Sequence, residues 1–361
     1  MGDLNKIREE INKVDASLAS LFEKRMELAK QVAEYKKENS IPIADAAREN
    51  LVVQNNLKLI SNKEVKPYYV NFIKSVMDIS KEYQYSLMNG LKISYSGIEG
   101  SYGYIAAKRM YPNCEFISAP NFAAAYKNVE DGKSDRAVLP LENSFAGDIG
   151  EVMDLIFKGS LYINRMYDLE VEHCLLSLDD ANISDIDTVI SHPQALEQCS
   201  KFIEDHNYKT IEEVNTAFAA RRLKEAGNKN CAVIASKENA KLFGLKILAE
   251  KINNSESNKT RFAAFSRILT SYSSEMTSKK NFILVFTVKN VAGALAKCLD
   301  VIGVHGFNMR NLKSRPLKNL MWQYYFFCEI EGDLESDLAK QMMTALKPFC
   351  DMLKVAGNYI I

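Results

Sequence analysis

The stretch NNSESNKTRF, residues 253–262, places in succession three side chains that could bind or transform a small molecule. It is polar up to Lys259 and ends on a hydroxyl, a guanidinium and an aromatic ring at Thr260, Arg261 and Phe262. The apolar run AAFSRIL follows, so a loop that ends where a strand begins explains the change in polarity. It does not explain why a hydroxyl stands beside a cation. A guanidinium binds a carboxylate through two hydrogen bonds, which indicates a small anionic substrate.

A second group of chemically capable residues lies near the N-terminus, within a pattern that predicts helices. Apolar residues recur at alternating intervals of four and three from Leu4 to Tyr35, which is typical of one long helix with a coiled-coil-like seam. Arg25 occupies a seam position, and Lys36 follows about three turns later on nearly the same face. Such a helix is too long to bury its seam alone, so we expect a partner helix from a second chain.

Two further helices follow the break at NSIPIAD. Asp45, Arg48 and Glu49 are spaced to share one face of the second helix, and Ser80 and Gln84 stand one turn apart on the third. On pattern alone, these residues form either a solvated face with local ion pairs or a cationic pocket inside a helical bundle, built for a dicarboxylate.

The rest of the chain changes its periodicity twice. Residues 91 to about 270 alternate short apolar runs such as RAVLPLEN and CAVIAS with helical stretches such as FAAAYKNVEDG and ALEQCSKFIEDH, which predicts an α/β architecture with mostly parallel sheets. The stretch SLYINRMYDLEVEHCLLSL indicates a crossing between two lobes. Residues 280–361 follow the ferredoxin-like order β-α-β-β-α-β after a polar linker. We therefore expect three domains, all-α at 1–89, α/β at 91–270 and α+β at 280–361.

Three more stretches of the middle segment carry polar residues at the ends of expected strands. GIEGSYGYIAA has glycines between a strand and a helix, but their spacing fits neither GxGxxG nor a P-loop. The helix N-terminus there still offers N–H groups to an anion. Glu142, Asn143 and Ser144 end a buried strand, and Ser191 and His192 stand at a strand-to-helix junction. Each alone is compatible with turn chemistry, a helix cap or a structural histidine.

The composition excludes several classes of function. The chain has 361 residues, of which 46 are Lys or Arg and 46 are Asp or Glu, and this balance argues against nucleic acid as a partner. The N-terminus lacks the apolar core of a signal peptide and no apolar run approaches the length of a membrane span, so we expect a cytoplasmic protein without a membrane partner. Its seven cysteines include no CxxC and its four histidines no metal-ligand spacing, which predicts reduced thiols and no metal.

The segment IREEINKVDASLASLFEKRMELAKQVAEYKKENSIPIADAAREN resembles the all-helical chorismate mutase family. That resemblance implies a concerted rearrangement of chorismate to prephenate, which needs no nucleophile and no proton transfer. Lys36 and Gln84 would donate hydrogen bonds to the ether oxygen, and Glu49 would accept one from the ring hydroxyl. The other polar positions, which would bind the substrate, are Arg8, Arg25, Asp45, Arg48 and Ser80. In the family two chains interlock through the first helix, and Arg8 would reach the partner's site.

The stretches ENS, SHPQALEQC and TRF together resemble prephenate dehydratase over about residues 91–270. The resemblance implies two α/β lobes with the site in the cleft between them. Thr260 would be the essential hydroxyl at the leaving group of prephenate, and Arg261 would anchor a carboxylate. The positions expected to line the cleft with them are Glu142, Asn143, Ser144, Ser191, Gln198 and Phe262. The acid that assists loss of hydroxide stays open between Thr260 and Glu142, because a buried carboxyl group can keep its proton near neutral pH.

The C-terminal segment resembles the ACT domain, a small-molecule sensor that usually pairs with another copy. GALAKCL and NMRNLKSRPL match the stretches that bind phenylalanine in regulated dehydratases. The implied regulatory positions are Gly293, Ala294, Leu295, Ser314, Arg315 and Pro316. Lys313 stands where that family usually has an acidic residue, which leaves open the contact to the amino group of phenylalanine.

Together these segments predict a bifunctional chorismate mutase–prephenate dehydratase that makes phenylpyruvate and is inhibited by L-phenylalanine. Neither reaction implies a metal or an organic cofactor. We expect a homo-oligomer, a dimer or a tetramer, because two of the domains require partner chains. One alternative is a dehydratase whose helical segment is only a dimerisation arm, and another is a two-lobed amino-acid sensor without catalysis. The polar set of the helices argues against the first, and Thr260 with Arg261 argues against the second. The absent nucleotide loop excludes a prephenate dehydrogenase.

Overall fold

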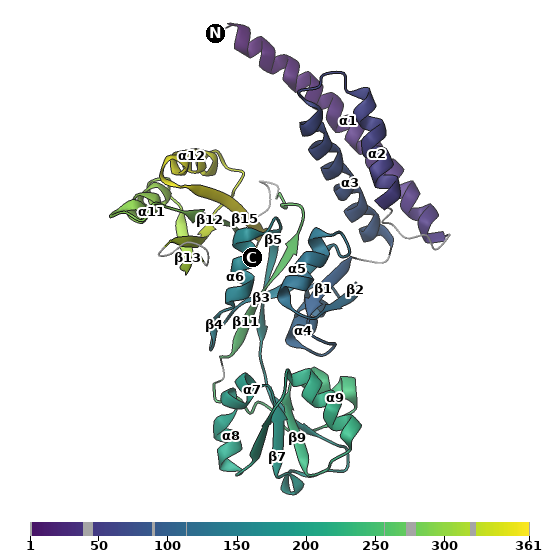
Figure 1. The fold of residues 1–361 in the computed structure, drawn as a ribbon, viewed down its shortest axis with the longest axis vertical. Coiled ribbons are helices and arrows are strands. Elements are labelled where there is room, and N and C mark those ends of the chain that lie inside the picture. Colours follow the sequence, from purple (N-terminus) through teal and green to yellow (C-terminus); the bar gives the residue numbers. More distant parts are fainter. Residues whose placement is uncertain are drawn as a thin grey trace. The chain divides into compact units, whose positions relative to one another are not determined.

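The structure, a computed structural model, describes residues 2–38, 46–88, 91–112, 114–255, 257–271, 279–317 and 323–360. The chain forms two compact units (Figure 1). The first holds residues 1–91 and 113–115, and the second holds the remaining residues up to Ile361. In the described ranges, no helix is both long enough and apolar enough to cross a bilayer.

The first unit consists of three helices, as the spacing of its apolar residues predicts. They are α1 (Gly2–Glu38), α2 (Ala46–Leu59) and α3 (Lys66–Met88). α1 has 37 residues, about 55 Å at 1.5 Å per residue, and its N-terminal half extends past the other two helices (Figure 1). Seam residues of that half are between 46% and 62% exposed: Leu4, Ile7, Ile11, Val14, Leu18 and Leu21. Further along, α1 packs against α3 and buries Ala29 and Ala33.

The second unit contains the two α/β lobes that the sequence predicts. The first lobe is built from β1 (Lys92–Ser96), α4 (Tyr102–Met110), β2 (Glu115–Ala119), α5 (Phe122–Glu130), β3 (Arg136–Asn143), β4 (Gly147–Asp148), α6 (Gly150–Lys158), β5 (Tyr162–Glu170) and β11 (Lys259–Ser266). The second lobe is built from β6 (Cys174–Ser177), η1 (Ile183–Asp185), β7 (Thr188–Ser191), α7 (Pro193–Gln198), α8 (Ser200–Asp205), β8 (Lys209–Glu212), α9 (Thr216–Ala226), β9 (Cys231–Ala235), α10 (Lys237–Phe243) and β10 (Lys246–Ala249). The chain crosses between the lobes after β5, as predicted, and returns after β10.

The prediction of mostly parallel sheets is wrong, since both sheets are mixed. In the first lobe, β3 pairs in parallel with β1 but antiparallel with β11, and β11 pairs antiparallel with β5. In the second lobe, β7 is parallel to β8 and β9, whereas β6 is antiparallel to β9 and β10. The double crossing is the reason. A strand that returns from the other lobe, such as β11, runs opposite to the strands that lead toward it.

The single helix expected in ALEQCSKFIEDH is interrupted, and α7 and α8 are separate short helices. Cys199, which lies between them, leaves the helical conformation with φ −118° and ψ 15°. The backbone N–H of Asn254, in the returning segment, donates to the carbonyl oxygen of Gln198 at 2.7 Å. That carbonyl is therefore bonded to a distant part of the chain, which the sequence pattern could not show.

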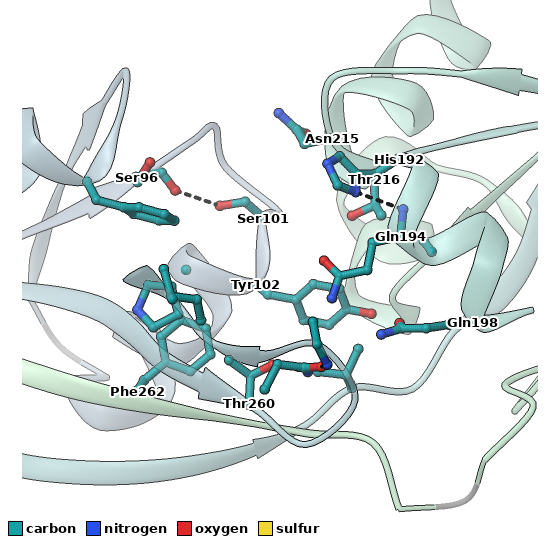
Figure 2. A pocket seen from close by; sticks show the side chains of 18 of the residues that line it. Ser96, Ser101, Tyr102, His192, Gln194, Gln198, Asn215, Thr216, Thr260 and Phe262 are labelled. Carbon is teal, nitrogen blue, oxygen red and sulfur yellow. Dashed lines mark hydrogen bonds between the residues drawn. The ribbon is translucent and has the colours of Figure 1, made fainter. Parts of the chain in front are cut away.

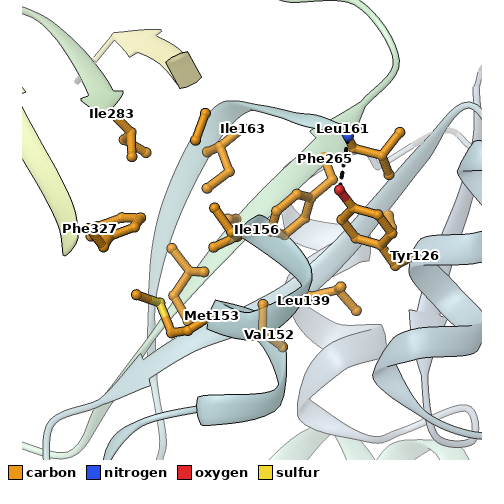
Figure 3. Packing of buried hydrophobic residues seen from close by; sticks show 14 of the residues in the cluster. Tyr126, Leu139, Val152, Met153, Ile156, Leu161, Ile163, Phe265, Ile283 and Phe327 are labelled. Carbon is orange, nitrogen blue, oxygen red and sulfur yellow. Dashed lines mark hydrogen bonds between the residues drawn. The ribbon is translucent and has the colours of Figure 1, made fainter. Parts of the chain in front are cut away.

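The C-terminal segment has the β-α-β-β-α-β order expected of it. Its elements are β12 (Lys280–Thr287), α11 (Ala294–Val304), β13 (Asn308–Pro316), β14 (Tyr324–Glu331), α12 (Asp337–Leu346), η2 (Lys347–Phe349) and β15 (Met352–Ile360). The strand order is β13-β14-β12-β15, and β15 continues into the first lobe by pairing with β5 at Gly357 and Ile163. One buried cluster spans this junction, with Ile283 and Phe327 on one side and Ile156 and Ile163 on the other (Figure 3). The C-terminal segment and the first lobe therefore share one sheet and one core.

The junction between β15 and β5 should not tolerate a side chain at Gly357. A Cβ atom there would lie 2.6 Å from the carbonyl oxygen of Ile163. We expect Gly357→Ala to lower the free energy of unfolding by about 1–3 kcal/mol, the usual cost of overpacking, in urea denaturation. Gly303→Ala is the matched control, because nothing lies within 4 Å of its Cβ position and alanine favours helix. Equal stability of the two variants would contradict this account of the junction.

Candidate active site

The two lobes of the second unit enclose a cavity of about 340 Å³. Its walls come from the end of β3, the start of β11, and the N-terminal ends of α4, α7 and α9 (Figure 2). The polar residues that line it are Ser96, Ser101, Tyr102, Asn143, Asp148, His173, His192, Gln194, Gln198, Asn215, Thr216 and Thr260. Of the residues expected in a cleft, the cavity brings together Asn143, Gln198, Thr260 and Phe262.

Thr260 and Asn143 form the centre of the site, where β11 begins beside the end of β3. They pair across the two strands, and Nδ2 of Asn143 donates a hydrogen bond of 2.9 Å to Oγ1 of Thr260. The orientation of the Asn143 carboxamide is fixed, because its Oδ1 accepts hydrogen bonds from the backbone N–H groups of Phe145 and Ala146 at 3.0 and 2.9 Å. Since Oγ1 accepts from Asn143, the hydroxyl hydrogen of Thr260 is left to donate into the cavity.

The same reasoning extends the hydrogen-bond pattern to Gln198. Nδ2 of Asn143 also donates to Oδ1 of Asn258 at 3.0 Å, so Asn258 donates through its own Nδ2, to Oε1 of Gln198 at 2.9 Å. Nε2 of His173 lies 2.9 Å from the same Oε1. Two groups therefore hold the oxygen of Gln198, and its amide NH₂ is left to donate to a ligand. Figure 2 shows Thr260, Gln198 and Tyr102 around one space.

Both histidines that line the cavity are held in the neutral form. His173 is 1% exposed, and burial lowers its pKa. Its hydrogen lies on Nε2, which faces the Gln198 oxygen, so Nδ1 is an acceptor, 3.1 Å from Oη of Tyr102. His192 caps α7, since its Nδ1 accepts from the backbone N–H of Gln194 at 3.2 Å, and burial lowers its pKa as well. Both histidines therefore act as neutral hydrogen-bonding groups.

Among the residues that the structure describes, no Lys or Arg lines the cavity. An anion in it would meet helix N-termini instead. α4 begins after Ser101 and α9 begins after Asn215, and both cap residues lie in the cavity wall. The first N–H groups of an α-helix have no intrahelical acceptor and carry positive partial charge. The sequence predicts the first of these positions at GIEGSYGYIAA; the second was missed.

Arg261 and Glu142, both expected in the cleft, face away from the cavity. Side chains alternate along a strand, so Arg261 points to the opposite face of β11 from Thr260. Its guanidinium binds Asp168, with Nε–Oδ1 at 2.8 Å and Nη2–Oδ2 at 3.1 Å, and this pairing lowers the pKa of Asp168. The carboxylate of Glu142 lies 2.8 Å from Nζ of Lys313. The guanidinium beside Thr260 is thus engaged outside the cavity.

Ser191 and Ser144 also lie outside the cavity wall. Ser191 is buried and donates to the carbonyl oxygen of Ile234 at 2.6 Å, and the residue that caps α7 is His192 and not Ser191. Ser144 donates to the carbonyl oxygen of Ser257 at 2.9 Å, which closes the loop before β11. Both hydroxyls therefore bond to the backbone.

Several members of the site are not indicated by the sequence, among them Tyr102, His173 and Asn258. The spacing of the histidines gives no metal-ligand pattern at His173, and Asn258 stands in a stretch that is polar up to Lys259. One feature of the sequence could have indicated His173: it is a polar residue directly before the apolar run CLL, in the segment that crosses between the lobes. These residues meet only because the chain crosses twice between the lobes.

In the first unit, residues expected to bind a dicarboxylate gather where α1 passes α3. Arg25 donates to the carbonyl oxygen of Val76 at 3.3 Å and to the hydroxyl of Ser80. Partial burial lowers the pKa of Arg25. Gln84, one turn further along α3, is buried as well. The structure thus brings Arg25 and Ser80 together and places Gln84 on the same helix.

The remaining positions of the helical set are less enclosed. Glu49 on α2 binds Nζ of Lys81 on α3 at 2.9 Å. The other expected positions are at least partly exposed on α1 and α2: Arg8, Lys36 and Arg48. Asp45 lies outside the described residues.

The residues expected to bind phenylalanine lie at two places in the C-terminal segment. Gly293–Leu295 stand at the start of α11, and Gly293 has φ 79°, a left-handed conformation that glycine adopts readily. Ser314–Pro316 end β13, the edge strand of the sheet. Nε of Arg315 lies 3.6 Å from Asp154 of α6.

The fold and the cleft define a protein with a helical unit and a two-lobed α/β domain. The cleft is lined mainly by neutral hydrogen-bonding groups, with no Lys or Arg in its described lining. Residues 7–85 match the family model of chorismate mutase type II, and residues 93–268 match that of prephenate dehydratase. The chain belongs to the family of bifunctional chorismate mutase/prephenate dehydratases. The prediction of an enzyme that combines these two domains is therefore confirmed.

Relatives with this description cover nearly the whole chain. The one from Enterobacter agglomerans is 31% identical over 98% of this chain and 95% of its own, and the one from Escherichia coli K12 is 30% identical over the same shares. Among solved structures, a prephenate dehydratase from Arthrobacter aurescens in complex with L-Phe has a TM-score of 0.68 and 25% identity, covering 74% of this chain and 89% of its own. GqqA, described as a novel type of quorum quenching acylase, has a TM-score of 0.69 and 29% identity, covering 74% and 97%.

Asn143→Asp should remove most of the dehydratase rate although the Thr260 hydroxyl remains. A carboxylate at this position cannot donate to Oγ1, so it accepts the hydroxyl hydrogen and turns it away from the cavity. We expect kcat for prephenate to fall by about 10²- to 10³-fold, the usual effect of losing one positioned donor. Asn207→Asp, at an exposed turn residue with φ 53°, is the control and should keep the rate. A rate for Asn143→Asp close to that of the wild type would refute the inferred hydroxyl direction.

His173 should make stability depend on pH. Burial lowers its folded-state pKa below the usual value of about 6.5, so its contribution is fully present above about pH 6.5 and is lost as the pH falls through the folded pKa. In urea unfolding from about pH 7.5 to about pH 5, the free energy of unfolding should fall, and it should fall less in His173→Gln. His206→Gln, at an exposed histidine, should keep the wild-type slope. A wild-type slope in the His173 variant would show that another group titrates.

Proposed function

We propose that the chain converts chorismate to prephenate in its helical unit and prephenate to phenylpyruvate in the cleft of its second unit. The observation that carries the second assignment is the Thr260 hydroxyl, whose hydrogen is directed into the cavity by the hydrogen bond from Asn143. Family membership supports both reactions.

In the cleft, the reaction breaks two bonds of prephenate. The electron pair of the bond between ring and carboxylate becomes part of the ring π system as carbon dioxide leaves. The C–O bond of the ring hydroxyl breaks with its electron pair on oxygen, and this oxygen becomes water when it takes up a proton. Aromatisation drives both cleavages. The Thr260 hydroxyl donates to the departing oxygen and stabilises its charge. Because Glu142 lies outside the cavity, this assignment favours Thr260 over Glu142.

The charge pattern of the cavity suits a decarboxylation. A cation on the departing carboxylate would stabilise the ground state more than the transition state, in which that charge is lost, and would slow the step. The described lining has no Lys or Arg. The carboxylate that is retained in the product would bind at the N–H groups that begin α4 and α9, whose caps are Ser101 and Asn215.

The helical unit performs a rearrangement that requires binding and charge stabilisation only. Arg25 and Ser80 would hold a carboxylate, with Lys36 and Gln84 donating to the ether oxygen and Glu49 accepting from the ring hydroxyl. Arg8 lies about 25 Å from Arg25 along α1, at 1.5 Å per residue, so it serves a different copy of the site. The exposed apolar seam of α1 supports the same homodimer, because a second α1 would bury it.

The C-terminal segment is, in this proposal, a ferredoxin-like ACT domain that binds L-phenylalanine and inhibits the dehydratase. The Arthrobacter aurescens relative, a complex with L-Phe, supports this effector. Gly293–Leu295 and Ser314–Pro316 would form its site. β13 is an edge strand, which suits pairing with a second copy of the domain.

Chorismate given alone to the purified chain tests the proposal, with the products followed over time. We expect wild type to yield phenylpyruvate and Thr260→Ala to accumulate prephenate, because the helical unit still acts while the dehydratase rate falls by about 10²-fold or more. Thr344→Ala, on α12, should behave as wild type.

Other product patterns would contradict the proposal and indicate a different function. Chorismate that remains while added prephenate is consumed would make the helical unit a dimerisation arm. If neither compound is consumed, the chain is a two-lobed sensor. Phenylpyruvate formation by Thr260→Ala at the wild-type rate would remove Thr260 from the mechanism.

A further inference from the structure

The two central residues of the cleft have neighbours that face the C-terminal segment. Asn143 pairs with Thr260 across β3 and β11, and the next pair along the same strands is Glu142 with Arg261. Because side chains alternate along a strand, the first pair faces the cavity and the second faces the other side of the sheet. Glu142 and Arg261 are here called the back-face pair.

Glu142 is held by a lysine of the C-terminal segment. Nζ of Lys313, on β13, lies 2.8 Å from Oε2 of Glu142 and also contacts Asp148. The Lys313 side chain is only 15% exposed. Asp148 lies opposite Glu142 in the pairing of β3 with β4 and lines the cavity. Lys313 therefore joins two carboxylates, one next to Asn143 in the chain and one in the cavity wall.

Arg261 is held from both sides of the junction. Asp168 on β5 binds its guanidinium with two hydrogen bonds. Nη1 of Arg261 also lies 3.9 Å from Oε2 of Glu329, on β14, whose side chain is 3% exposed. Glu329 accepts a hydrogen bond from the Tyr359 hydroxyl and lies 3.5 Å from Nε of Arg310. A buried carboxylate requires such partners, so Glu329 is fixed where it meets the back-face pair.

We propose that Lys313 and Glu329 are positioning residues of the dehydratase, which hold the back-face pair and thereby the register of β3 against β11. The inference rests on the proposed function of the cleft. Lys313 binds β3 through Glu142, and Glu329 lies beside Arg261 on β11. Neither strand can therefore shift along the other without separating an ion pair. The hydrogen bond from Asn143 to Thr260 depends on that register, since a shift of one residue would turn every side chain of the strand to the other face.

The sign of the charge at position 313 is therefore a specific requirement. Glu142 and Asp148 both face it, so an acidic residue there would be repelled by two carboxylates. The resemblance to phenylalanine-regulated dehydratases leads one to expect an acidic residue at this position. In this chain two carboxylates surround residue 313, so a cation is favoured there. Lys313, which departs from the family pattern, therefore has a structural role at this position.

Lys313→Glu tests the first contact. We expect kcat for prephenate to fall by about tenfold or more while KM changes by less than about threefold, because the cavity keeps its lining but loses the alignment of Thr260. The chorismate mutase rate, measured on the same sample, should stay at the wild-type value. Lys340→Glu makes the same charge change at an exposed residue of α12 and should leave both rates unchanged. A wild-type dehydratase rate in Lys313→Glu would overturn the proposal.

The charge-swapped variant separates positioning from loss of folding. Glu142→Lys alone should be impaired like Lys313→Glu. The two changes together should raise kcat at least about threefold above either single variant, because the ion pair between positions 313 and 142 reappears with its signs exchanged, while Asp148 still repels an acidic residue at position 313. A double variant no better than the single ones would refute the proposal.

Arg261→Met distinguishes a positioning residue from a substrate anchor. A guanidinium that binds a carboxylate of prephenate would, when removed, raise KM, whereas one that holds β11 would lower kcat. We expect kcat to fall by about tenfold with KM within about threefold of wild type. A rise in KM alone would overturn the assignment. Failure of the proposed function is separate, because wild type itself would then leave prephenate unchanged.

Discussion

One hydrogen bond, from Asn143 to Thr260, organises the candidate active site in the cleft. Its two residues are 117 positions apart in the sequence. They meet because β11 returns from the second lobe and pairs with β3, and the bond gives the Thr260 hydroxyl a direction. A hydroxyl that rotates freely would have to be oriented by the substrate, whereas here the protein orients it in advance.

The direction of that bond is set by the backbone and carried onward by side chains. Two backbone N–H groups fix the orientation of the Asn143 carboxamide. Its NH₂ donates to the Asn258 oxygen, and the Asn258 NH₂ donates in turn to the Gln198 oxygen, which neutral His173 also contacts. The cavity therefore presents donors without a cationic side chain in its described lining. The helical unit solves the opposite problem. In the proposed reaction the substrate keeps its carboxylate charges, and the helical unit offers them a cation, Arg25, whose guanidinium donates to the Ser80 hydroxyl.

The C-terminal segment is structurally continuous with the lobe that carries Asn143 and Thr260. It continues the sheet of the first lobe through β15 and shares its buried core. Its charged residues Lys313 and Glu329 reach the far side of the two strands that carry the site. An effector that moves this segment would act on strand register directly, without a separate path to the cavity.

The order and class of most elements could be predicted from local sequence patterns. Periodicity predicted the three helices of the first unit and the β-α-β-β-α-β order of the C-terminal segment, and the structure has both. Motifs placed Asn143, Gln198 and Thr260 in a common site, and the cavity contains all three. The sequence also predicted that Thr260 and Arg261, because they are adjacent, both contact the substrate. This prediction is wrong, because successive side chains of a strand point to opposite faces of the sheet.

Tertiary structure alone decided which way each side chain faces and which distant residue it meets. The hydroxyl faces a cavity and the guanidinium faces Asp168, although the two are neighbours in the chain. His173 and Asn258 joined the site because the chain crosses twice between lobes, and the sheets are mixed for the same reason. Local patterns record propensity and periodicity. Partners brought together by non-local strand pairing leave no such pattern, because the contact exists only once the whole sheet has formed.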